Sequence, residues 1–62
     1  MFIKQLLIAG KGEPIDRFAE EVIRYCQAIQ TGVVAVFNEI YIEVKPTMTE
    51  KEFMHQYWRN RQ

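Results

Sequence analysis

Cysteine and histidine are almost absent from this chain of 62 residues, which holds one of each, Cys26 and His55. A single cysteine cannot form a disulfide within the chain, and a structural zinc site needs about four cysteine or histidine ligands. The two devices that most often stabilise small domains are therefore missing. A chain of this length then gains stability by associating with itself or with a partner.

Net charge is also absent, because eight Lys and Arg residues balance eight Asp and Glu residues. The whole chain therefore has no general attraction for nucleic acid or for anionic membranes. The apolar start of the chain, residues 1–9, is too short for a membrane span and lacks the longer apolar core of a signal peptide. We expect a cytoplasmic protein without a membrane partner.

Apolar residues, by contrast, are plentiful: 48% of the chain is hydrophobic and 13% is aromatic. This composition is typical of a folded domain and differs from that of disordered chains. We expect one compact domain over residues 1–62, of the α+β class, because the patterns described next indicate both helices and strands.

The clearest pattern predicts a helix from residue 14 to about residue 30. Apolar side chains recur there at steps of three and four residues, at Ile15, Phe18, Ala19, Val22, Ile23, Cys26 and Ile29. Pro14 suits the first helical position, and Gly32 suits a left-handed residue that ends the helix.

Two β-rich segments, 33–37 and 40–44, follow with Asn38-Glu39 between them as a two-residue hairpin loop. This loop would pair Phe37 with Ile40, Ala35 with Ile42 and Val33 with Val44 on one wholly apolar face that packs on the helix. The other face would carry Val34, Val36, Tyr41, Glu43 and Lys45.

A last helix is expected to begin at Thr49. Thr49 and Glu52 have the spacing of a capping box, and Met48 and Phe53 have that of a hydrophobic staple. Its apolar stripe would be Phe53, Met54, Tyr57 and Trp58. For residues 2–9 we favour a short helix, with a third strand as the alternative. The predicted order of elements is thus α-α-β-β-α.

No set of residues predicts catalysis, a metal site or a cofactor. The segment Gly10-Lys11-Gly12 lies before a helix, but it lacks the longer glycine frame and the following Ser or Thr of a phosphate loop, so we interpret it as a connector. Cys26 belongs to the apolar stripe of one helix and His55 to another helix, which argues against a dyad. Surface and capping roles account for Glu20, Glu21, Glu50 and Glu52.

The end of the chain mixes aromatic and basic residues, which suits contacts to phosphates and stacking on bases. Lys51, Arg59 and Arg61 would make those contacts. We favour the simpler interpretation that the aromatic residues pack in the core and the arginines complement the helix end. Nucleic-acid binding through this helix stays the alternative function.

The segments VVAVFNEIYIEVKP and TMTEKEFMHQYWRNR, which span residues 33–61, give a hairpin followed by a capped helix. This pattern resembles the ending of small uncharacterised bacteriophage and prophage proteins and covers about half of the chain. The resemblance implies a phage or prophage accessory protein with a binding or modulating role, and it supplies no functional residues.

Taken together, these patterns predict a protein that is not an enzyme, needs no cofactor and acts by protein interaction. The partner would be a second copy of the chain or one host or phage protein. The predicted interface is the second face of the hairpin, at Val34, Val36 and Tyr41, because these apolar side chains would stand together on one surface.

Overall fold

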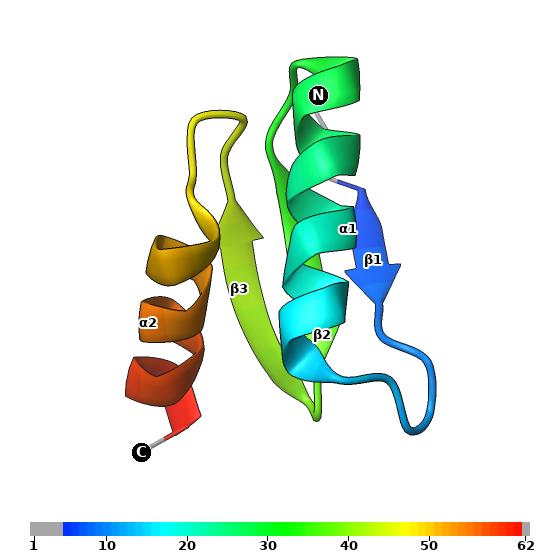
Figure 1. Cartoon of the computed structure of the whole chain (residues 1–62), viewed down its shortest axis with the longest axis vertical. Helices are drawn as coiled ribbons and strands as arrows, with labels where there is room; N and C mark the ends of the chain where they lie inside the picture. Colours follow the sequence, from blue (N-terminus) through cyan, green and yellow to red (C-terminus); the bar gives the residue numbers. More distant parts are fainter. Residues whose placement is uncertain (1–4, 62) are drawn as a thin grey trace.

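The computed structural model describes residues 5–61, which form three strands and two helices (Figure 1). In chain order these elements are β1 (Leu6–Ile8), α1 (Ile15–Ile29), β2 (Val33–Phe37), β3 (Ile40–Val44) and α2 (Glu50–Arg61). The α+β class is therefore confirmed. The predicted order is wrong at the first element, which is a strand.

The three strands form one sheet in the order β1-β2-β3. β1 is parallel to β2, and α1 makes the crossover between them, whereas β2 and β3 form the antiparallel hairpin. Phe37 pairs with Ile40, Ala35 with Ile42 and Val33 with Val44, as the sequence predicted. In parallel pairing, Leu7 lies opposite Ala35.

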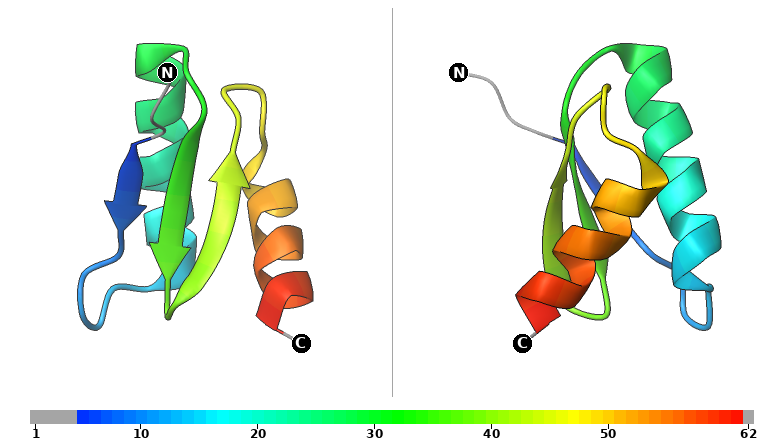
Figure 2. Two further views of the ribbon diagram at one scale, coloured as in Figure 1. Left: turned by 180° about the vertical axis from the view of Figure 1, so that it is seen from behind. Right: turned by 60° about the vertical axis from the view of Figure 1, so that its left-hand side comes forward.

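Both helices lie on the same side of the sheet (Figure 2). α1 covers the sheet and α2 packs beside it against β3, so the two helices also contact each other. Nothing in the described part of the chain covers the opposite side. The fold thus has two layers, helices on one side and the sheet on the other, with the core between them.

The core joins all the larger elements through apolar and aromatic side chains. Phe18 of α1 stacks at a tilt on Phe37 of β2, with ring centroids 5.8 Å apart, and meets the edge of Phe53 of α2 at 6.2 Å. Phe37 in turn contacts Tyr57 at 5.5 Å. The fully buried members with the largest side chains are Phe53, Ile42, Val22, Val33, Val44 and Cys26.

The first element corrects our prediction, because Leu6–Ile8 is a strand and not part of a helix. The expected helix would have left one side of β2 without hydrogen-bond partners. In the structure the backbone N–H of Val34 donates to the carbonyl of Gln5, and that of Ala9 donates to the carbonyl of Val36, both at 2.9 Å. The backbone hydrogen bonds to β2 therefore decide the conformation of this segment, although its apolar residues repeat every four positions as in a helix. The apolar residues 2 and 3 of that repeat lie outside the described residues.

The helix α1 is confirmed, but its two ends differ from the prediction. Pro14 is the residue before the first turn, and the left-handed residue at the other end is Gln30, with φ of 54°. The Gln30 side chain donates to the carbonyl of Gln27 at 2.6 Å. Gly32 instead permits a close approach, because a Cβ atom there would lie 3.2 Å from the carbonyl oxygen of Val44.

The hairpin loop and the start of α2 are confirmed. Asn38 and Glu39 both have positive φ, at 51° and 66°, as a tight two-residue hairpin loop requires. The backbone N–H of Glu52 donates to the Thr49 hydroxyl at 3.2 Å, so Thr49 caps α2. Met48 and Phe53 are both buried, as expected for the staple.

Candidate interaction surface

The side of the sheet away from the helices carries exposed apolar side chains from β1 and β3 and half-buried ones from β2. Val34 and Val36 of β2 lie there with Tyr41 of β3, which is opposite Val36. Strand β1 adds Leu6 opposite Val34 and Ile8 opposite Val36. We call these five residues the open sheet face. They adjoin one another because alternate residues of paired strands share one side of a sheet.

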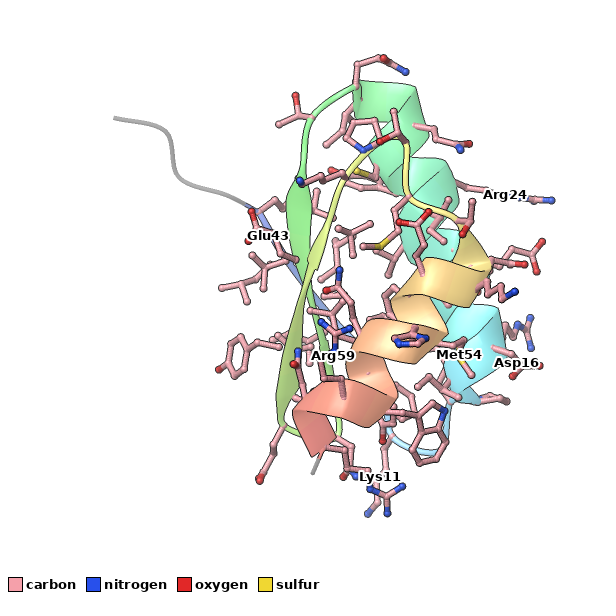
Figure 3. All side chains as sticks on the ribbon, turned by 90° about the vertical axis from the view of Figure 1, so that its left-hand side faces the viewer. Lys11, Asp16, Arg24, Glu43, Met54 and Arg59 are labelled. Carbon is pink, nitrogen blue, oxygen red and sulfur yellow. The ribbon has the colours of Figure 1, made fainter. Side chains whose placement is uncertain are left out.

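Exposure is highest at the two margins of the open sheet face. Ile8 is 73% exposed, Tyr41 64% and Leu6 53%, whereas Val34 and Val36 between them are half-buried by their neighbours. Glu43 of β3 also projects to the side away from the helices (Figure 3). The row formed by Ile8, Val36 and Tyr41 is therefore apolar across all three strands, whereas Glu43 lies opposite Val34 in the neighbouring row.

The sequence prediction identified Val34, Val36 and Tyr41 correctly as one side of the ribbon, and the structure adds Leu6 and Ile8. These two residues were missed because residues 2–9 were expected to be a helix. The available signal was the step of two residues between Leu6 and Ile8, which places both on the same side of a strand. That signal is weak in a strand of three residues.

The two edges of the sheet differ in protection. Beyond β3, the Asn60 side chain of α2 donates to the outward carbonyl of Tyr41 at 3.2 Å. Beyond β1 the described residues place no further element. β1 is therefore the open edge of the sheet.

An apolar groove follows the open edge on the helix side. Leu7 and Ile8 of β1 form one wall, and Phe18, Val22 and Tyr25 of α1 form the other; its volume is about 290 Å³. The Tyr25 hydroxyl donates to the Gln5 side chain at 2.6 Å and bridges α1 to the start of β1. Glu13 and Glu21 line the same groove.

The loop Gly10-Lys11-Gly12 lines a second hollow, of about 530 Å³, together with Phe37 and Asn38. The Glu13 carboxylate accepts a hydrogen bond from the backbone N–H of Gly10 at 3.0 Å. A carboxylate of the chain itself thus occupies a donor that an anion would use. The geometry agrees with the interpretation of this loop as a connector.

Cys26 is completely buried on α1, and its thiol donates to the carbonyl oxygen of Thr31 at 3.0 Å. Burial raises the pKa of this thiol, which disfavours the thiolate that a nucleophile needs. His55 is exposed on α2. The structure therefore does not bring the two residues into one site.

Three carboxylates line the groove between the two helices. Asp16 and Glu20 of α1 and Glu50 of α2 line it together with Lys51 and Met54. Glu20 pairs with Arg24 at 3.1 Å. Over residues 5–61, no three His, Cys, Asp or Glu side chains are arranged so that they could hold a metal ion.

Two of the basic residues of α2 lie on different sides of the helix. Arg59 and Arg61 are two positions apart, which places them about 160° apart around the helix axis. Lys51 lies about two turns earlier, in the groove beside Glu50. Binding of nucleic acid by these three residues stays a prediction from the sequence.

The aromatic residues of α2 divide between core and surface. Tyr57 is buried, so its ring is not accessible to a base, and Trp58 is 50% exposed, which corrects its expected place in the core. The Arg61 guanidinium lies 5.2 Å from the Trp58 ring centroid, a cation–π contact within the chain.

The comparisons with known proteins add no functional assignment. No family model matches the sequence, and neither the curated proteins nor the solved structures contain a significant match. The resemblance to phage proteins therefore stays a prediction. None of the helices formed by residues 5–61 combines the length and the apolar character that crossing a membrane requires.

Proposed function

We propose that this protein is a non-enzymatic interaction protein that associates with itself through the open sheet face. A role as a phage or prophage accessory protein is the setting that the sequence pattern implies. The observation that carries the proposal is the one-sided architecture: both helices pack on one side of the sheet, and the other side is apolar and exposed at Leu6, Ile8 and Tyr41.

Burial of the open sheet face in an assembly would add hydrophobic stabilisation to that of the small core of one chain. A fully buried Val, Leu or Ile side chain contributes on the order of 1.5 to 3 kcal/mol. Contiguous apolar surface of this kind is more typical of interfaces than of free monomer surfaces. Tyr41 suits an interface as well, because a tyrosine ring packs on apolar groups while its hydroxyl can form a hydrogen bond.

The test is the mass of the protein in solution, measured by light scattering over a range of concentrations. We expect the parent protein to be larger than a monomer and Tyr41→Asp to be smaller, because the charge cannot be buried without a partner. Val36→Asp makes the same change at the centre of the face. Ile29→Asp, on the exposed end of α1, is the matched control, and circular dichroism verifies folding.

A parent protein that is monomeric at every concentration would contradict the proposal. So would a Tyr41→Asp variant that keeps the full assembly. If the purified protein instead carries nucleic acid that added salt removes, the alternative function through Lys51, Arg59 and Arg61 gains support.

A further inference from the structure

Strand β1 directs part of its hydrogen-bonding capacity away from the sheet. The carbonyl of Gln5 and the N–H of Ala9 bond to β2. Backbone groups alternate in direction along a strand, so Leu7 also bonds toward β2, and the N–H and C=O groups of Leu6 and Ile8 point outward. The outer edge thus presents two donors and two acceptors at regular spacing.

Among residues 5–61, the feature that protects this edge is the short length of β1, which has three residues. Proteins also protect exposed strands by charges, proline, a bulge, or a covering helix or loop. β3 has such a cover, because Asn60 of α2 bonds to the outward carbonyl of Tyr41. Within Leu6–Ile8 there is no charge and no proline.

We infer that the outer edge of β1 pairs antiparallel with β1 of a second copy of this chain, about a two-fold axis at Leu7. The two sheets then join into one sheet of six strands. The inference rests on the proposed function in one respect, since it requires self-association, and it specifies an edge contact in addition to the face.

The register of the edge suits a second copy as the occupant. In antiparallel pairing centred on Leu7, Leu6 of each copy lies opposite Ile8 of the other. Both residues direct their N–H and C=O groups outward, so each pair exchanges two hydrogen bonds and all four outward groups are satisfied. Leu7 then lies opposite Leu7 of the second copy. An isologous contact of this kind is self-complementary, as a two-fold axis requires.

The side chains fit the same arrangement. Leu7 lies in the apolar groove between β1 and α1, so pairing places both Leu7 side chains together between the two copies of α1. On the other side, Leu6 and Ile8 of one copy lie next to those of the second. The two open sheet faces thereby become one surface.

The small area of one sheet favours edge pairing of two copies. The strands lie about 4.8 Å apart, and β1 is about 10 Å long whereas β2 and β3 are about 17 Å each, so together they offer roughly 210 Å² of flat area. A stable interface buries about 800 Å² per partner. One open sheet face is therefore small for an interface, and edge pairing doubles it while adding backbone hydrogen bonds.

Amide hydrogen exchange of the parent protein tests the pairing directly. Measured by NMR above and below the concentration at which the protein associates, the amides of Leu6 and Ile8 should exchange about tenfold more slowly or better in the associated form. The outward amide of Tyr41 serves as the comparison, because β3 forms the other edge of the sheet.

Two substitutions at one position separate the edge from the face. Ile8→Pro removes an outward N–H without removing a bond to β2, and it should weaken association about tenfold or more, measured by sedimentation. Ile8→Thr is the matched control, because it keeps the N–H and the β-branched shape but removes apolar surface. It should retain pairing and slow exchange at Leu6.

The possible results distinguish failure of the edge pairing from failure of the open sheet face. An associated protein in which the Leu6 and Ile8 amides exchange as fast as in the monomer would overturn the edge pairing alone. Slow exchange at those amides together with a full-sized Tyr41→Asp assembly would overturn the role of the open sheet face alone. A protein that never associates would overturn both.

Discussion

Thr49 and Cys26 show how single side chains fix the ends and the interior of the helices. The Thr49 hydroxyl accepts the N–H of Glu52 and lies 3.4 Å from the Glu52 carboxylate, so it satisfies a donor that the first turn of α2 would leave without a partner. Cys26 is 0% exposed and fills the space between α1 and the hairpin as a small apolar group.

Removing the cap of α2 should lower the stability of the whole domain. We expect Thr49→Ala to reduce the free energy of unfolding by about 0.5 to 2 kcal/mol, because one N-terminal N–H loses its partner. Chemical denaturation followed by circular dichroism measures the change. Thr47→Ala, an identical substitution at an exposed residue of the same loop, is the control and should change stability much less. Equal effects of the two variants would show that the cap contributes nothing.

Titration of Cys26 should make the domain less stable in alkaline solution. Burial raises the pKa of its thiol above the ordinary value of 9.0, so above pH 9.0 the unfolded chain loses this proton first. The unfolded state then binds fewer protons than the folded state, and the free energy of unfolding falls as the pH rises. Below pH 9.0 this contribution is fully present.

The measurement is the unfolding free energy of the parent and of Cys26→Ala between pH 8 and pH 10. Cys26→Ala should be less stable at every pH because it leaves a small cavity, but its curve should be flatter. Parallel curves for the two proteins would exclude the thiol as the cause.

At the scale of elements, the hairpin is defined by its loop. Two residues with positive φ match the twist of β2 and β3, and they fix the register that separates the apolar core side from the open sheet face. Asn38 adopts such a conformation with little strain, whereas Glu39, with φ of 66°, is a less favourable residue there.

Replacing Glu39 with glycine should therefore stabilise the hairpin. Glu39→Gly relieves left-handed backbone strain of about 1 kcal/mol, part of which the greater freedom of glycine in the unfolded chain offsets. We expect a small increase in melting temperature. Glu43→Gly, which puts glycine inside β3, should lower it. A decrease for Glu39→Gly would mean that the Glu39 side chain makes a contribution of its own.

At the scale of the whole molecule, the two helices leave one side of a thin sheet uncovered. A chain of 62 residues buries a limited fraction of its surface, so its free energy of unfolding is small and association adds to it. The open sheet face and the open edge of β1 are the surfaces through which association would add to the free energy of unfolding.

Self-association should make the melting temperature depend on protein concentration. A dimer that dissociates on unfolding gains stability as concentration rises, by mass action. We expect calorimetry to show a rising melting temperature for the parent protein and a constant one for Tyr41→Asp. A melting temperature independent of concentration in both proteins would indicate a monomeric folding unit.

The sequence by itself determined the elements whose signals are local. The three- and four-residue repeat of α1, the loop at Asn38-Glu39 and the capping box at Thr49 each act through neighbours in the chain, so those elements were predicted almost to the residue. The pairing within the hairpin followed from the loop, and with it the common side of Val34, Val36 and Tyr41.

Only the tertiary structure decided the first element and hence the extent of the open sheet face. Leu6–Ile8 is too short to nucleate its own structure, and its conformation depends on hydrogen bonds to β2, nearly thirty residues away in the chain. The same long-range pairing brought Leu6 and Ile8 beside Val34 and Val36. It also left the outer edge of β1 open, because a parallel strand placed first in the sheet has a neighbour on one side only.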